Sequence, residues 1–127
     1  MLFRSLAREY MYTNDLEGLA YAAEEAFNKN PWDPERAAVQ RWTGEYLDSP
    51  GHLSTATVVC PEEAENWHAL AAHHYRHEQW DACMQAADRG LTCKPTEHYL
   101  RDESVLAWRL YDLLAIAHWS QIGRAHV

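Results

Sequence analysis

Apolar residues recur along this chain with the three-and-four spacing of amphipathic helices. Two stretches carry the same series of apolar positions, 64 residues apart. The first stretch contains Phe3, Leu6, Ala7, Tyr10, Leu16, Leu19, Ala23, Ala26, Phe27 and Pro31, and the second contains Trp67, Leu70, Ala71, His74, Trp80, Cys83, Ala87, Gly90, Leu91 and Pro95. The first four residues of each series lie at i, i+3, i+4 and i+7, which is one face of a helix, and the rest form a second helix that ends before a proline. The pattern therefore predicts a repeated pair of helices, and a third copy begins at Tyr111, Leu114, Ala115 and His118.

This series resembles a tetratricopeptide repeat, in which a large residue, a leucine and a small residue mark one face of the first helix. We expect the small residues Ala7, Ala71 and Ala115 to lie where two helices touch, because a larger side chain there would overpack the contact. The expected fold is all-α: a tetratricopeptide-like α-solenoid of antiparallel helix pairs with about three repeats, the last one truncated.

The helices are expected near residues 2–13, 15–29, 34–48, 62–77, 79–92 and 104–120. Residues 52–60 are expected to form either a short helix or an irregular loop, with the helix favoured, because Thr and Val are poor helix formers. Since the two matching stretches lie 64 residues apart, a 34-residue unit must be followed by one of about 30. An insertion of about ten residues is expected around 96–105.

The last six residues, 122–127, read IGRAHV, which is what ATC GGA AGA GCA CAC GTC encodes. That string is a common sequencing adapter, so we expect residues 1–121 to be the repeat domain and 122–127 to be an adapter-derived tail. On this reading the natural protein continues beyond about Ser120.

The charge and the cysteine content exclude several classes of protein. The formal net charge is −8, with 19 acidic and 11 basic residues, which argues against a nucleic-acid partner. No apolar run approaches the length of a membrane span. Three cysteines without a CxxC spacing indicate neither a disulfide framework nor a zinc knuckle. We therefore expect a cytoplasmic protein.

Few residues carry recognisable chemistry. His73 and His77 are four residues apart on a helix and could chelate a metal, but we expect no metal site because a third ligand is not evident. The tryptophans are expected mostly in the core, with Trp42 and Trp108 on inward faces, and the Glu62–Glu65 stretch is expected at a solvated helix start. The sequence holds no nucleophile or phosphate-loop motif, so we expect no catalytic residue and no cofactor in this chain.

Three segments closely resemble the helical region that follows the catalytic domain in certain bacterial and phage glycosyltransferases. They are LFRSLAREYMYTNDLEGLAYAAEEAF, AENWHALAAHHYRHEQWDACMQAADRGLTCKPTEHYLRD and WRLYDLLAIAHWSQ. The resemblance covers nearly all of residues 2–120 and includes the insertion at Glu97–Leu100, while Leu110 stands where the family has proline. It implies a sugar-nucleotide-dependent transferase whose metal-binding DxD domain lies upstream, so no catalytic residue carries over.

The resemblance and the repeat register together suggest where partners would bind. The first helix of each pair would line a concave face that contacts the protein's own catalytic domain, another protein or a glycan acceptor. The candidate residues are Arg4, Arg8, Met11, Tyr12, His68, Ala72, Tyr75 and Arg76. A free-standing repeat adaptor that binds a partner protein is the alternative. We also expect weak self-association, because a truncated solenoid exposes an apolar end.

Overall fold

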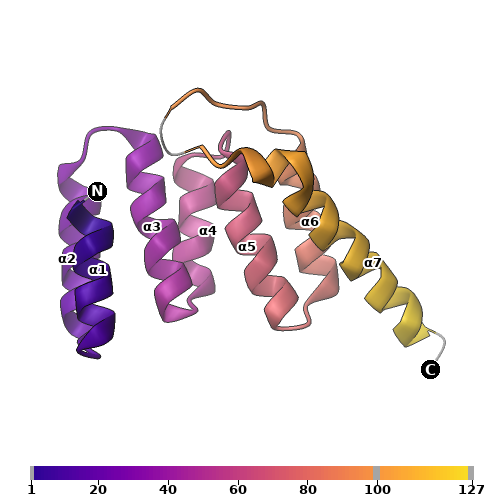
Figure 1. Ribbon diagram of the computed structural model, residues 1–127, viewed down its shortest axis with the longest axis horizontal. Coiled ribbons are helices and arrows are strands. Elements are labelled where there is room, and N and C mark those ends of the chain that lie inside the picture. Colours follow the sequence, from indigo (N-terminus) through magenta and orange to yellow (C-terminus); the bar gives the residue numbers. More distant parts are fainter. Residues whose placement is uncertain (1, 99–100, 126–127) are drawn as a thin grey trace. The chain divides into compact units, whose positions relative to one another are not determined.

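The computed structural model describes the backbone of residues 2–98 and 101–125 and the side chains of residues 6–98 and 101–123. All regular structure in these residues is helical, as the sequence predicted, and the described residues contain no strand. The chain divides into two compact units, residues 1–60 and residues 61–127 (Figure 1).

The first unit holds four helices, each packed against the next one along the chain: α1 (Leu2–Tyr12), α2 (Leu16–Lys29), α3 (Asp33–Leu47) and α4 (Pro50–Val59). The segment expected as either helix or loop is therefore helical. Pro50 stands in the first turn of α4, where a missing N–H costs nothing, and the hydroxyl of Ser49 caps the helix. Ala37, Ala56 and Cys60 are fully buried together, so α4 is held by burial rather than by its helix propensity.

The second unit holds α5 (Ala64–Arg76), α6 (Trp80–Leu91), a five-residue π-helical turn η1 (Val105–Arg109) and α7 (Leu110–Ala125). Helix α5 packs against α6, and α7 packs mainly against α6 and also against α5. The insertion expected around residues 96–105 lies in the connection between α6 and η1. The π-helical turn at its end was not predicted.

The same left-handed turn joins α1 to α2, α3 to α4 and α5 to α6. Asn14, Asp48 and Glu78 have φ angles of 56°, 51° and 56°. In each case the next residue donates its backbone N–H to a carbonyl five residues earlier, which is a Schellman closure: Asp15 to Tyr10 at 2.7 Å, Ser49 to Gly44 at 2.9 Å and Gln79 to His74 at 2.8 Å. The three left-handed residues are spaced by 34 and then 30 residues, which matches the predicted division of the first 64.

The expected helix contacts are present in two of the three copies. Ala7 and Ala71 are both fully buried, as predicted. Ala115 is exposed, however, and helix α7 buries Leu110, Leu113 and Ala117 instead. The side that carries Ala115 has no helix over it among the described residues, which explains the difference.

One tryptophan prediction is confirmed and the other is wrong. Trp42 is 6% exposed, as its inward face predicted. Trp108 is 58% exposed, because η1 and α7 bury the side that carries Val105 and Leu110.

Candidate functional site

The candidate residues on α5 follow one side of that helix. His68, Ala72 and Tyr75 are partly buried, and Arg76 is exposed at the last turn. The ring of Tyr75 meets that of Trp80 edge to face, with 5.8 Å between the ring centres, so the α5–α6 packing holds the tyrosine. This side of α5 therefore combines a cation, two aromatic groups and a small residue within reach of a ligand.

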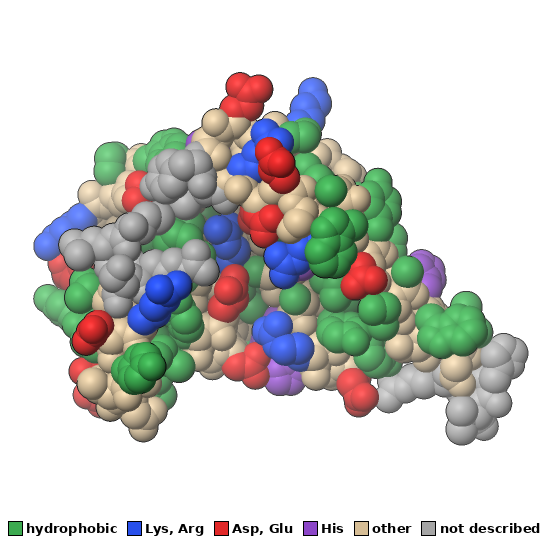
Figure 2. Space-filling view, in the orientation of Figure 1, with side chains coloured by type: hydrophobic (Ala, Val, Ile, Leu, Met, Phe, Trp, Pro, Cys, Tyr) green, Lys and Arg blue, Asp and Glu red, His purple; other side chains and the backbone are tan. Residues whose placement is uncertain are grey.

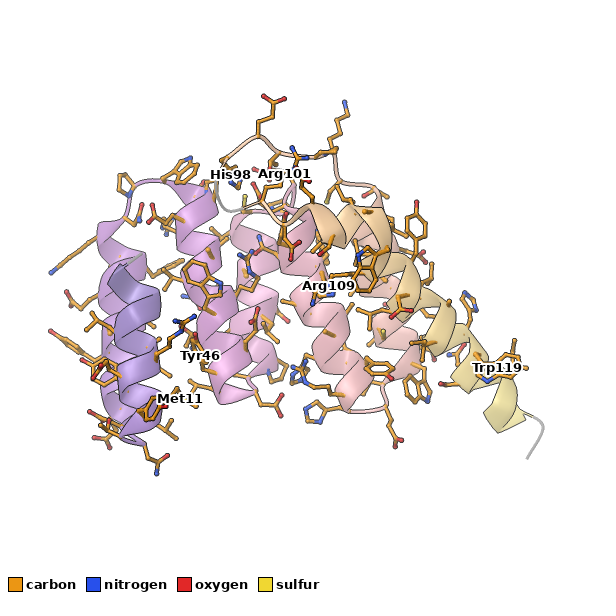
Figure 3. All side chains as sticks on the ribbon, viewed as in Figure 1. Met11, Tyr46, His98, Arg101, Arg109 and Trp119 are labelled. Atoms are coloured by element: carbon orange, nitrogen blue, oxygen red, sulfur yellow. The ribbon has the colours of Figure 1, made fainter. Side chains whose placement is uncertain are left out.

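The candidate residues on α1 are mostly exposed. Arg8 is exposed, Tyr12 is 94% exposed and Met11, near the end of the helix, is 38% exposed (Figure 3). The side chain of Arg4 lies outside the described residues. Since α1 and α5 belong to different units, the structure supplies two separate groups of candidate residues, each placed on its own helix.

His73 and His77 lie against each other on α5. Their ring centres are 4.4 Å apart, with His73 only 4% exposed and His77 exposed. This closeness follows from the i, i+4 spacing. Two imidazoles supply fewer protein ligands than the three or four of ordinary zinc sites, so the pair by itself does not define a metal centre.

An open depression of about 730 Å³ lies at the turn between α5 and α6. Glu78, Trp80, Asp81 and Gln121 are among the residues that line it, and the Gln121 amide donates a hydrogen bond to the Asp81 carboxylate. The His74 ring and the Gln79 amide are 2.7 Å apart at its edge. Sequence reasoning missed this depression, since Gln121 comes from a helix distant in the chain.

Two buried carboxylates anchor the insertion to the start of α5. Glu63 is 4% exposed and lies 2.5 Å from His98, while the hydroxyl of Thr96 donates to it at 3.5 Å. Glu65 is 9% exposed and accepts the backbone N–H of Asp102 at 2.9 Å. Figure 3 shows His98 and Arg101 in this connection, above the start of α5. The expectation of a solvated helix start is therefore wrong for these two residues, because their partners come from more than 30 residues away.

The end of the insertion is held by a second carboxylate. Asp102 accepts hydrogen bonds from the Ser104 N–H at 3.0 Å and hydroxyl at 2.6 Å, and it pairs with Arg109 at 3.1 Å. These hydrogen bonds from Ser104 lower the pKa of the Asp102 carboxyl, and Arg109 adds to the effect. The space beneath this segment is about 50 Å³, far below the several hundred Å³ that a nucleotide-sized ligand needs.

The cysteines are not placed as nucleophiles. Cys60 and Cys83 are fully buried, as expected, and burial raises the pKa of the Cys83 thiol to about 11. Burial also raises the pKa of Cys93, and the nearby Glu65 carboxylate adds to that shift. A catalytic cysteine needs the opposite shift, since the thiolate is the reactive form.

The visible surface carries acidic and basic side chains interspersed over both units (Figure 2). None of the described helices is both long and apolar enough to cross a bilayer. Comparisons of the chain with protein-family models, with curated proteins and with solved structures found no match. The functional argument therefore rests on the residues themselves.

Proposed function

We propose that this chain is a non-catalytic helical repeat module of the tetratricopeptide type. We further propose that it forms part of a sugar-nucleotide-dependent glycosyltransferase, in which it packs against the catalytic domain or binds the acceptor or a protein partner. The observation that carries the repeat assignment is the turn that recurs at Asn14, Asp48 and Glu78 with 34- and 30-residue spacing. Independent sequence segments that close the same turn at these intervals are typical of duplicated helix pairs.

The exposed side of α5 supports a binding role. Tyr75 and Arg76 offer an aromatic surface and a cation, and these residue types are enriched where proteins meet their partners. The ring contact with Trp80 fixes the tyrosine, which lowers the entropy that binding would cost. A preformed surface of this kind suits a protein or glycan ligand better than the small cavity beneath the insertion does.

The transferase assignment is tested by the gene and then by the protein. The reading frame should continue upstream into a domain with a DxD motif, and that domain, expressed separately, should bind the purified 127-residue chain. Arg76→Glu should weaken this binding about tenfold or more, since it reverses a charge on the candidate face. Lys94→Glu is the matched control, because Lys94 is exposed on the connection after α6 and should leave binding unchanged.

A negative result would be equally clear. An upstream frame without a transferase domain would overturn the transferase assignment. Loss of binding in both charge-reversal variants would show a general charge effect and would exclude a specific role for α5.

The second candidate is a free-standing adaptor that binds a partner protein. The observation that favours it is the exposure of Tyr12 and Met11 on α1, since large apolar side chains in water often mark interaction sites. A short gene with its own start and stop signals would favour this alternative over the transferase.

A further inference from the structure

Helix α7 presents a row of large apolar side chains to solvent. Trp108, Tyr111 and Trp119 are 58%, 57% and 76% exposed, and Ala115 between them is also exposed. Tyr111 and Trp119 lie four residues before and after Ala115, so all three share one face of the helix. Figure 3 shows Trp119 directed away from the helix near its end. We call Trp108, Tyr111, Ala115 and Trp119 the α7 stripe.

The equivalent face of α5 shows what such a surface accommodates. In the repeat register, Ala71 on α5 corresponds to Ala115 on α7, and Trp67 corresponds to Tyr111. Helix α6 covers this face of α5, so that Ala71 is fully buried, and a Cβ on Gly90 would lie 3.0 Å from the Trp67 Cβ. The α7 stripe is therefore the kind of face on which a second, antiparallel helix packs closely.

We infer that the occupant of the α7 stripe is α7 of a second copy of this chain, packed antiparallel about a two-fold axis at Ala115. The spacing carries this choice, because the stripe is self-complementary about its small central residue. Across such an axis Ala115 faces Ala115 of the other copy, and Tyr111 lies beside Trp119 of the other copy. A two-fold interface uses the same surface on both copies, and the small central residue allows an axis separation of about 8 Å.

The flanks of the stripe fit a small interface with a polar rim. Asp112 and His118 are exposed on either side of Ala115. Ile122 extends the stripe by one turn, but the inference does not depend on it because that residue lies in the expected adapter-derived tail. A single helix–helix contact lies at the small end of protein interfaces, so we expect a dissociation constant of about 10–500 µM.

Two measurements test the dimer. Sedimentation velocity of the full chain from about 5 µM to about 1 mM should show a reversible monomer–dimer equilibrium in the expected range. Ala115→Arg should shift it to monomer by at least about tenfold in the dissociation constant, because it places two like charges at the axis. Circular dichroism should be unchanged, since Ala115 is exposed.

The second measurement fixes the geometry. In a Cys93→Ser background, Ala115→Cys should form a disulfide-linked dimer under mild oxidation, because the two β-carbons face each other across the axis. Ala107→Cys is the matched control, because it is equally exposed but lies eight residues from the axis and should stay monomeric.

Three outcomes would overturn the inference. A chain that stays monomeric to about 1 mM has no such interface, and its stripe then serves a different helix. Association without the Ala115→Cys cross-link would place the contact elsewhere, for example between α7 and the α1–α2 end of another copy. Equal cross-linking of both cysteine variants would show random collision.

Discussion

The close contact between α3 and α4 makes a sharp prediction for Gly44→Ala. A Cβ at this position would lie 2.6 Å from Cγ, 2.8 Å from Cδ2 and 3.0 Å from the backbone nitrogen of Leu53, which is fully buried. Helix propensity favours alanine by about 1 kcal/mol, but overpacking costs about 1–3 kcal/mol. Because a backbone atom cannot rotate away, we expect the upper part of that range and a net loss of about 1–2 kcal/mol.

Gly51→Ala is the matched control, since it is the same change in a helix of the same unit. The nearest atom to a Cβ there is the Ser49 hydroxyl oxygen at 3.8 Å, so the propensity gain of about 0.5–1 kcal/mol should appear undiminished. Urea unfolding followed by circular dichroism should therefore give opposite signs for the two variants. A Gly44→Ala variant as stable as the Gly51→Ala variant would refute the close packing of α3 on α4.

Three further predictions concern the second unit. Ala71→Leu should destabilise it by about 1–3 kcal/mol in urea unfolding, and an unchanged midpoint would contradict the helix contact at Ala71. Because Asp102 has a lowered pKa in the folded chain, its contribution should be complete above the ordinary carboxyl pKa and should be lost as the pH falls through the folded value. The stability gap between wild type and Asp102→Asn, less than about 1 kcal/mol for this partly exposed group, should thus close between about pH 5 and pH 2, and a gap that widens in acid would refute this sign. Cys83, with its thiol pKa of about 11, should react with a disulfide reagent at pH 8 only at the rate of unfolding, and rapid labelling of the native chain would show that it is accessible.

Local signals explain why most of the fold could be predicted. The helices are marked by three-and-four spacing and by starts such as Asp15, whose carboxylate accepts the Gly18 N–H at 2.9 Å. The burial of Ala7 and Ala71 followed from the same spacing. The closeness of His73 and His77 was also predictable, since it depends only on one turn of helix.

The features that escaped prediction depend on contacts distant in the sequence. Glu63 reads as a solvated helix start until His98, 35 residues later, covers it. Likewise, a local pattern marks the apolar faces of α7 but does not say which face a neighbouring helix covers, so Trp108 was placed inside when it lies outside. The α5–α6 depression needs Gln121 from α7, which no motif announces.

The three left-handed turns also determine where the chain tolerates added length. Each turn closes its own helix hairpin with a bond across five residues, so an extra residue at Asn14, Asp48 or Glu78 would rotate one helix of a pair against the other. The connection between α6 and η1 has no such constraint, and it is there that the second unit carries a long non-helical segment. Duplication, recombination and deliberate fusion of foreign segments should therefore succeed between hairpins and fail within them.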